Sequence, residues 1–492
     1  MAYITSYKNQ DWLLPPSIKQ MIPENHICFF VEEFVENLDF SGFDMIYEGA
    51  GAPAYHPRIL MKIILQGMLC GERSSRKIAK ACFENFVFMY LAEKVKPNFR
   101  TICRFRRQNA SFIKEAFKES IKLADKHQLL DLSMISIDGT TISANANKKK
   151  SLRPEQVENL EKAVDLIVEE DLKRDEIDEK IFSEEENLSN MDKKDFRKII
   201  SEFRKHKDMK KLKEKVERVK EEINSDEKIK KVSLTDPESR MMQNKKRIRE
   251  LSYNAQLSVS KNQIIVANDV CQDGYDVKQL VPQIEQVKEN VELKGGEKFS
   301  ADCGYSDGEN IKYCEDRGID LYVPNRAQAQ KFDGKDESLN HDKYEYDSKN
   351  DELIAGGERF RYRGMYTRKN GKKIISFYSE KLKKKKDVPM EFKSRLRMRD
   401  KMETSQGREV YAFRKITVEP VIGNLKENFR FRKFVLRGLD GVRLELNLVS
   451  LSHNLKKIWL AGGSLRCEGK NIEFWVIIKE RVVGQAPLLN PR

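Results

Sequence analysis

Apolar residues recur at helical spacing through the first 130 positions of the chain. A helix is expected over about 28–38, and PRILMKIILQGMLCG predicts another that starts with Pro57 in its first turn and stops at Gly71. Ser74 is placed to cap RKIAKACFENF, and Asn98 is placed to cap FRTICRFRRQ. Several short helices joined by tight turns are therefore predicted for this region.

The helix predicted for FRTICRFRRQ has two distinct faces. Phe99, Ile102 and Cys103 fall on one side, and three arginines fall on another: Arg100, Arg104 and Arg107. Short helices with one arginine-rich face are typical of helix-turn-helix modules that bind DNA. A small helical bundle with a solvated basic face is the alternative. We favour DNA binding for residues 57–128.

The pattern changes at residue 131, where short apolar runs replace helical periodicity. Met134 to Gly139 reads as a central strand that ends in an acid, Asp138, and a glycine, with Thr140 to Ile142 as a possible extension. LSYNAQLSVSKNQIIVANDV reads as two strands joined at Lys261-Asn262. Two helices and two strands follow in alternation: a helix over 276–291, a strand over 298–302, a helix over 307–317 and a strand over 319–323. This order predicts a mixed α/β sheet.

Two insertions interrupt this α/β pattern. Residues 150–232 are dominated by charged residues, but apolar residues such as Leu160 and Val164 still recur at helical spacing, which predicts a charged helical insertion with a helical hairpin as one arrangement. Residues 326–400 alternate like exposed antiparallel strands, with Asn370-Gly371 as a turn. A closing amphipathic helix is expected over 445–461.

These patterns divide the chain into six parts. They are an N-terminal helical DNA-binding domain (1–130), the first parts of an α/β catalytic core (131–149 and 233–325), a charged helical insertion (150–232), a β-rich basic insertion (326–404), the C-terminal helical part of the core (405–462) and a tail (463–492).

Composition narrows the classes of partner and cofactor. The net charge of +14 indicates a polyanionic partner. No run of eighteen apolar residues, signal-peptide order or lipidation motif is present, so we expect a cytoplasmic protein that does not enter a membrane. Eight cysteines without a C-x-x-C pair fit reduced thiols better than disulfides or zinc. A bound metal would then be held by carboxylates, which favours Mg²⁺ or Mn²⁺.

Three acids are the best candidates for such a site: Asp138, Asp302 and Glu419. Two acids at the ends of neighbouring parallel strands, with a third on a nearby helix, can bind two divalent ions about 3.5–4 Å apart and act on a phosphodiester. Each aspartate has an alternative role as a turn or helix-cap residue. Glu419, which is followed by a strongly basic segment, has an alternative role as a paired surface acid. Glu445 is the alternative third acid, since it opens the predicted closing helix.

Four segments together resemble the transposases of bacterial insertion sequences. They are SIDGTTISANANK, TDPESRMMQNKKR with YNAQLSVS, SADCGYSDGENI, and YAFRKITVEPVIGNLKENFRFRKFVLRG. PRILMKIILQGMLCGERSSRKIAKAC resembles an N-terminal domain of one branch of that family. The resemblance implies a ribonuclease-H-like fold and an Asp-Asp-Glu triad, matched here by Asp138, Asp302 and Glu419, that holds two Mg²⁺ or Mn²⁺ ions.

The resemblance also implies contacts with DNA phosphates. Tyr411, Arg414, Glu419 and Lys426 match a Y-R-E-K signature, with four residues between Arg and Glu where many relatives have three. On a continuous helix Lys426 would share the face of Glu419 and Arg414 would not, so we rank Lys426 above Arg414. Pro420 indicates that Tyr411 and Arg414 precede the helix. The basic stretches 381–399 and 430–437, which include Arg430 and Arg432, are expected to hold phosphates.

The predicted function is metal-dependent cleavage of DNA at the ends of an insertion sequence and joining of those ends to target DNA. The expected partners are double-stranded DNA, both terminal inverted repeats and target, and a second copy of the chain in a homodimer. The expected location is the bacterial cytoplasm, with the nucleoid. Two alternatives remain: a catalytically inactive DNA-binding protein or repressor derived from a transposase, and a ribonuclease-H-like nuclease that cuts without joining. Several relatives carry a cysteine cluster before the signature, and because residues 326–410 contain no cysteine we expect no zinc there.

Overall fold

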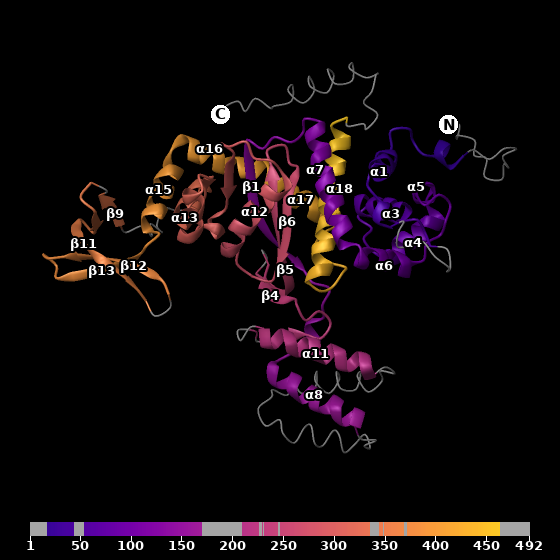
Figure 1. Cartoon of the computed structure of the whole chain (residues 1–492), viewed down its shortest axis with the longest axis horizontal. Helices are drawn as coiled ribbons and strands as arrows, with labels where there is room; N and C mark the ends of the chain where they lie inside the picture. Colours follow the sequence, from indigo (N-terminus) through magenta and orange to yellow (C-terminus); the bar gives the residue numbers. More distant parts are fainter. Residues whose placement is uncertain are drawn as a thin grey trace, which may run out of the picture. The chain divides into compact units, whose positions relative to one another are not determined.

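A computed structural model describes residues 17–43, 54–169, 209–225, 229, 231–244, 247–334, 344–347, 349–368 and 371–462 (Figure 1). The chain divides into two compact units, which are described separately. The first comprises residues 1–119 and 451–492, and the second comprises residues 120–450.

The first unit is helical in all of its described part. Its elements are η1 (Ile18–Met21), α1 (Ile27–Glu36), α3 (Pro57–Leu69), α4 (Ser75–Glu84), α5 (Phe86–Leu91) and α6 (Phe99–Gln108). Helix α3 begins at Pro57 as predicted, and the chain leaves it through Gly71, whose φ of +71° suits a residue without a Cβ. Asn98 caps α6 by accepting a 2.9 Å hydrogen bond from the Thr101 amide. Ser74 occupies the cap position of α4, but the predicted capping is wrong in detail because its side chain makes no cap hydrogen bond.

Helix α6 has the two faces that the sequence predicts. Ile102 is buried, and Phe99 and Cys103 are half-buried beside it. The three predicted surface arginines are all exposed: Arg100, Arg104 and Arg107. Arg106 belongs to the opposite group, because its side chain is only 1% exposed and donates a 2.7 Å hydrogen bond to the Arg73 carbonyl. The basic face of α6 is therefore distinct from this structural arginine.

A six-stranded mixed sheet forms the centre of the second unit. Its strands are β1 (Met134–Ser143), β4 (Arg240–Gln243), β5 (Arg249–Ser260), β6 (Ile265–Cys271), β7 (Lys298–Ala301) and β8 (Asp320–Tyr322). Strand β5 pairs antiparallel with β1, β4 and β6, and β1, β7 and β8 pair parallel to one another. The mixed sheet and the hairpin around Lys261 are thus confirmed. Between the strands lie η3 (Val277–Gln279), α12 (Leu280–Asn290), η4 (Cys303–Tyr305) and α13 (Gly308–Asp316).

Strand β1 includes the extension through Thr140, Thr141 and Ile142 that the sequence allows. It pairs with β5 from Ile135 to Ser143, so Asp138 lies in mid-strand and the expectation that it ends a strand is wrong. The neighbour on the other side, β7, pairs only as far as Ile137. Asp138 therefore lies where the parallel pairing ends, although the strand itself continues.

The two faces of the sheet are covered by different helices. The Ser258 hydroxyl of β5 donates a 2.9 Å hydrogen bond to Oε1 of Gln283 in α12. Thr417 and Lys426 of the segment that contains α17 (Val418–Glu427) donate hydrogen bonds to Ser136 and Thr140 of β1. Ser258 is paired with Ile137, and side chains of successive residues in a strand point to opposite faces. Helices α12 and α17 consequently lie on opposite faces.

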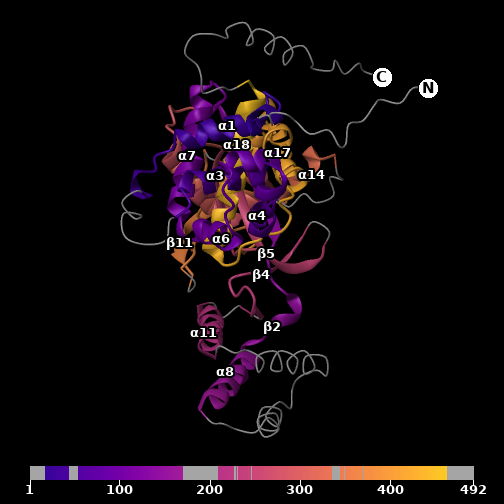
Figure 2. The ribbon, with the colours of Figure 1, turned by 90° about the vertical axis from the view of Figure 1, so that its right-hand side faces the viewer.

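The two insertions have the predicted secondary structure only in part. Helices α8 (Pro154–Glu169) and α11 (Met209–Ser225) run side by side, joined by a 2.7 Å ion pair between Glu161 and Lys220 (Figures 1 and 2), and they are flanked by the paired strands β2 (Ser151–Leu152) and β3 (Val232–Ser233). Predicted helical positions between 170 and 208 lie outside the described residues. A second sheet is antiparallel and contains β9 (Tyr344–Asp347), β10 (Glu352–Ala355), β11 (Glu358–Thr367), β12 (Lys373–Ser379) and β13 (Lys384–Pro389). Two helices in this region are not anticipated by the strand-like pattern: α14 (Arg326–Phe332) and α15 (Phe392–Glu403).

Helices also precede β1 and follow the second sheet. Helix α16 (Ser405–Phe413) is followed by η5 (Arg414–Ile416) and then by α17. Helix α18 (Leu439–Leu460) begins six positions before the predicted closing helix, and α7 (Ala110–Lys126) precedes β1. Within the described residues, none of the helices has the length and apolar character that crossing a membrane requires.

Candidate functional site

The two predicted aspartates occupy matching positions on neighbouring strands. Ile137 of β1 is paired with Ala301 of β7 in a parallel register, and Asp138 and Asp302 each come one residue later. Paired strands lie about 4.8 Å apart, and residues in matching parallel positions point to the same face. Asp302 keeps an extended backbone, with φ −79° and ψ 174°, as it leaves β7. The fold therefore brings two residues together that are 164 positions apart in the sequence.

Helix α17 carries Glu419 to the face on which Asp138 lies. Ser136, Asp138 and Thr140 alternate along β1 and share one face. The buried Thr417 hydroxyl lies 2.8 Å from that of Ser136, and the Lys426 ammonium donates to the Thr140 hydroxyl. The segment thus runs along β1 on both sides of Asp138. Glu419 is exposed in the first turn of α17, seven residues before Lys426 and so on the same side of the helix.

Arg414 provides the positive charge among these acids. Its side chain is 6% exposed, and Nη2 lies 3.2 Å from Oδ2 of Asp138, which is itself 15% exposed. Burial alone lowers the pKa of Arg414, but the charges of Asp138, Asp302 and Glu419 outweigh burial and raise that pKa. The guanidinium is therefore permanently charged and attracted to all three acids.

The helical-face comparison that ranked Lys426 above Arg414 does not apply, because the helix is not continuous between Arg414 and Glu419. Tyr411 and Arg414 precede α17, as Pro420 indicates. The backbone between Arg414 and α17 passes through η5 and through Thr417, whose φ of −108° and ψ of −86° are not helical. Because of this break, the direction of the Arg414 side chain relative to Glu419 does not follow from the rotation of about 100° per residue of a helix. Both Arg414 and Lys426 contact β1: Arg414 pairs with Asp138, and Lys426 donates to the Thr140 hydroxyl.

Tyr411 and the arginines that follow α17 differ in exposure. Tyr411 is 8% exposed, with its ring 5.6 Å from that of Phe332 and 5.5 Å from the Arg414 guanidinium. Burial is the main reason why its pKa is raised to about 12, so Tyr411 stays protonated. Arg430 and Arg432 are exposed, and Arg432 forms an ion pair with Glu427. Lys433 and Arg437 of the same segment are exposed as well.

The acids fit hard cations by their chemistry but do not form a complete metal cage. Carboxylate oxygens are the ligands that Mg²⁺ and Mn²⁺ prefer. Within the described residues, however, no group of three or more His, Cys, Asp and Glu is arranged so that it could hold a metal ion. Arg414 takes up one oxygen of Asp138 instead. Asp138 and Asp302, which lie at matching positions on neighbouring strands, would supply the first two carboxylates of a metal site.

Glu445, the alternative third acid, has a structural role. Its side chain is 1% exposed, and Oε2 accepts hydrogen bonds of 2.8 and 2.9 Å from the backbone amides of Val435 and Leu436. It does not open the closing helix, because α18 begins at Leu439. Both partner amides lie in the chain that leads from α17 to α18, so Glu445 fixes this connection.

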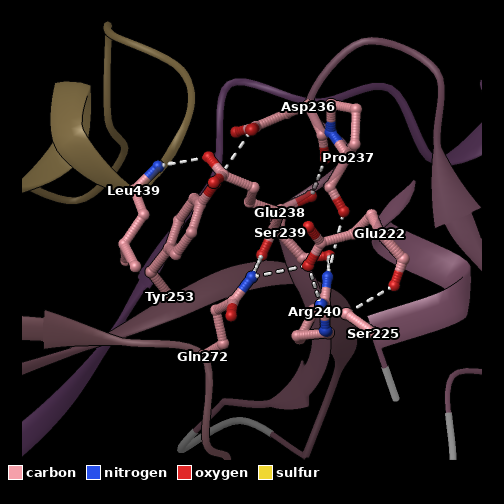
Figure 3. A network of polar contacts seen from close by, with 10 residues as sticks. All are labelled: Glu222, Ser225, Asp236, Pro237, Glu238, Ser239, Arg240, Tyr253, Gln272 and Leu439. Atoms are coloured by element: carbon pink, nitrogen blue, oxygen red, sulfur yellow. Dashed lines mark hydrogen bonds and ion pairs between the residues drawn. The ribbon is translucent and has the colours of Figure 1, made fainter. Parts of the chain in front are cut away.

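The TDPESR segment also anchors α18 (Figure 3). Asp236 is 1% exposed, and Oδ1 accepts hydrogen bonds from the Tyr253 hydroxyl at 2.8 Å and the Gly438 amide at 3.0 Å. Glu238 accepts from the Leu439 amide, the first residue of α18. Acceptors at a helix N-terminus satisfy amides that have no partner within the helix. This motif therefore supports the fold rather than the candidate site.

Sequence reasoning missed Asp276 and Gln256, which lie behind the aspartates. A Cβ at position 139 would be 2.4 Å from Oδ1 of Asp276 and 2.4 Å from Nε2 of Gln256, so only glycine fits after Asp138. The signal in the sequence is the NAQLSVS run, in which Asn254, Gln256 and Ser258 alternate with apolar residues inside a strand that is buried on both faces. Buried polar side chains at such spacing require partners, and Asp276 is one of them.

Two stretches of the chain match known protein families. Residues 16–108 match a transposase domain family, and residues 378–459 match a transposase DDE domain family. The resemblance to DDE transposases is confirmed. The first match of this transposase-like chain covers η1 to α6, and the second covers β12 to α18 with Glu419, Lys426 and Arg414. A search of curated proteins gave no match.

Proposed function

We propose that this transposase-like protein cuts DNA at the ends of an insertion sequence and joins the freed ends to target DNA. The observation that carries the proposal is the placement of Asp138 and Asp302 at matching positions of β1 and β7, with Glu419 brought to the same face by α17. The DDE domain match includes Glu419. Transposase families imply binding to DNA, and cleavage and joining are the activities proposed for this chain.

The sheet topology supports a ribonuclease-H-like core. Three antiparallel strands, β6, β5 and β1, are followed in space by β7 and β8, both parallel to β1. In open α/β sheets, ligands bind beyond the carboxyl ends of the strands, where neighbouring strands diverge. Asp138 and Asp302 lie where β7 ends beside β1. This is the position at which the proposed fold would place its active site.

The acids and the basic residues of the candidate site have separate roles in the proposal. Asp138, Asp302 and Glu419 would hold Mg²⁺ or Mn²⁺, two ions in all, which when bound supply charge neutralisation at the phosphodiester and an activated water. Arg414 holds the Asp138 carboxylate in its present orientation and neutralises part of the acidic charge when DNA is absent. Lys426, Arg430 and Arg432 would contact DNA phosphates along one edge of α17 and the segment after it.

The helical unit and the basic insertion would hold longer stretches of DNA. Arg100, Arg104 and Arg107 form an exposed face on α6, within the transposase domain match. The stretch 381–399 contributes exposed lysines and arginines. We propose that α6 recognises the terminal inverted repeats and that a homodimer brings two element ends together. We also propose that the domains are divided as the sequence predicts.

One observation favours a second candidate function, DNA binding without cleavage. The Arg414 guanidinium is bonded to Asp138, and the described residues hold no three-acid metal group. A chain fixed in this state would bind element ends and act as a repressor. A nuclease that cuts without joining is the third possibility.

One assay separates these functions. The protein is incubated with labelled DNA that carries the inverted repeats flanking its coding region, in Mn²⁺ or Mg²⁺. A transposase yields nicked and joined products, a nuclease yields nicked DNA alone, and a repressor yields neither although it shifts the DNA in a gel.

The acids are tested in the same assay by comparing Glu419→Gln with Glu445→Gln. Glu419 is exposed, so its replacement leaves stability unchanged but lowers nicking by at least about 100-fold if it belongs to the active site. Glu445→Gln keeps an acceptor for the Val435 and Leu436 amides, and nicking is expected to stay within about threefold of wild type. Full nicking by Glu419→Gln or by Asp302→Asn would refute the proposed triad.

A further inference from the structure

A chain of three polar side chains lies behind the candidate aspartates, on the α12 face of the sheet. Oδ1 of Asp276 accepts a 2.6 Å hydrogen bond from Nε2 of Gln256, and the other end of the same amide, Oε1, accepts a hydrogen bond from the Tyr305 hydroxyl. Asn254 adds a second donor to Oδ1 of Asp276, at 2.7 Å. These bonds connect three separate segments of the chain.

The geometry of this chain is fixed by burial. Gln256 and Tyr305 have no exposed surface, so neither can exchange its partner for water. In the bond between Tyr305 and Gln256 the tyrosine hydroxyl is the donor, because Oε1 of the amide can only accept. With Tyr305 donating to Oε1, the Gln256 amide has only one orientation, which leaves Nε2 to Asp276.

Tyr305 is the last residue of the turn that begins at Asp302. The Asp302 side chain accepts a 2.7 Å hydrogen bond from the Gly304 amide, and its carbonyl accepts a 3.1 Å bond from the Tyr305 amide. The Tyr305 carbonyl in turn accepts a 3.1 Å bond from Asn310. Both the side chain and the backbone of Asp302 are thus bonded to a turn whose far end is tied to Gln256.

Space around the turn is as restricted as its hydrogen bonds. A Cβ at Gly304 would lie 2.8 Å from Oδ1 of Asp302 and 3.5 Å from Oδ2 of Asp276. Asp276 therefore lies beside both glycines, Gly139 and Gly304, that follow the two aspartates. Any shift of Asp276 or Gln256 would be transmitted to the backbone next to Asp138 and Asp302.

We propose that Asp276, Gln256 and Tyr305 are positioning residues that hold the Asp302 turn in register with Asp138. They act through hydrogen bonds and not as ligands or proton donors to DNA. The part of the proposal that concerns DNA cleavage rests on the proposed function, whereas the part that concerns the turn does not. Two experiments test these parts separately.

The first experiment measures amide hydrogen exchange across residues 303–306 in the full chain without DNA or metal. Tyr305→Phe removes only the hydroxyl, and we expect exchange in this turn to rise by about tenfold, the effect of one lost buried hydrogen bond on local opening. Tyr253→Phe is the matched control: it removes the hydroxyl of another fully buried tyrosine, which donates to Asp236, and it should leave this turn unchanged. Unchanged exchange at 303–306 in Tyr305→Phe would overturn the proposal.

The second experiment compares two substitutions of Asp276 in the nicking assay over a range of Mn²⁺ concentrations. Asp276→Asn keeps an oxygen acceptor for Gln256 and Asn254 and loses only the charge, so we expect a maximal rate within about threefold of wild type. Asp276→Ala loses the acceptor and should match Tyr305→Phe, with a maximal rate about tenfold lower. Equal losses in both Asp276 variants would show a role of the charge itself and overturn the positioning role. If wild type does not nick DNA, the proposed function fails while the exchange result still decides the first part.

Discussion

Lys62 carries a charge into the interior of the helical unit. Its side chain is 2% exposed, and Nζ lies 2.5 Å from Glu36 and 3.3 Å from Glu93, on two other elements. Burial by itself lowers the pKa of Lys62, but its bonds with these glutamates outweigh burial and raise the pKa above the ordinary 10.5. A lysine that is buried only because it is paired links α1, α3 and the turn after α5.

Replacing Lys62 is expected to lower stability and to change its dependence on pH. Because the folded pKa is raised, the contribution of Lys62 is complete below the ordinary pKa and is lost as pH rises through the folded value. Lys62→Met should lower the free energy of unfolding by about 1–3 kcal/mol at pH 7. It should also flatten the decline of stability above about pH 10.

Urea denaturation followed by circular dichroism at several pH values checks this prediction. Lys77→Met is the control, since Lys77 is 65% exposed and its 3.0 Å pair with Glu72 is a surface pair worth about 0–1 kcal/mol. Equal losses in the two variants at pH 7 would contradict the assigned role of Lys62.

For single residues, the sequence shows which acids and arginines are candidates for a site, and the fold decides which of them are buried and which are exposed. Asp138, Asp302 and Glu419 stand out because acids follow or precede short apolar elements, and the matching register of β1 and β7 agrees with that pattern. Arg106 and Arg107 are adjacent arginines, yet one is buried and the other exposed. Their difference depends on which side of α6 faces the core.

Among the elements, α4 and α6 show how one cap residue differs from another. Asn98 accepts a hydrogen bond from the Thr101 amide at the start of α6, whereas Ser74 makes no such bond at the start of α4. A side-chain cap satisfies an amide that otherwise has no partner in the helix. The start of α6 therefore depends on its cap, and the start of α4 does not.

Replacing the two caps is expected to have different consequences. Asn98→Ala should destabilise the helical unit by about 1 kcal/mol, the usual effect of a lost N-cap. Ser74→Ala should change stability by less than about 0.5 kcal/mol. Thermal unfolding of both variants tests the comparison, and a larger loss in Ser74→Ala would show that the capping assignment is incorrect.

The connection from α16 to α17 is the element that sequence periodicity describes least well. Pro420 correctly indicates a helix start, since it lies in the first turn of α17. The direction of the chain before that start depends on η5 and on the backbone of Thr417, whose hydroxyl is held by Ser136 of β1. A contact between residues 281 positions apart thus decides where Arg414 points.

For the whole molecule, the excess of positive charge is the property most directly related to DNA. The chain has a net charge of +14, and α6 exposes three arginines in the transposase domain match. Contacts with phosphates release bound counterions, so DNA affinity is expected to fall steeply as salt rises. A buried arginine such as Arg106 does not contribute to this dependence.

Removing two arginines from α6 should reduce the salt dependence of DNA binding. In Arg104→Ala with Arg107→Ala, the slope of log affinity against log salt should become shallower by about 2, about 0.9 for each lost phosphate contact. The control removes two lysines that pair with acids on their own helices, Lys288 with Glu285 and Lys312 with Asp316. Fluorescence anisotropy between low and high salt gives both slopes. An equal change in both double variants would place the contact elsewhere.

The sequence by itself determined the helical first region, the hairpin of β5 and β6, the mixed α/β character and the acids of the candidate site. These depend on local patterns: apolar periodicity, Pro and Gly at element ends, and acids beside short apolar runs. Tertiary structure alone decided that Asp138 lies in mid-strand, that Arg414 pairs with it, and that Asp276 and Gln256 stand behind it. Those features depend on strand register and on contacts between distant segments, which no local pattern contains.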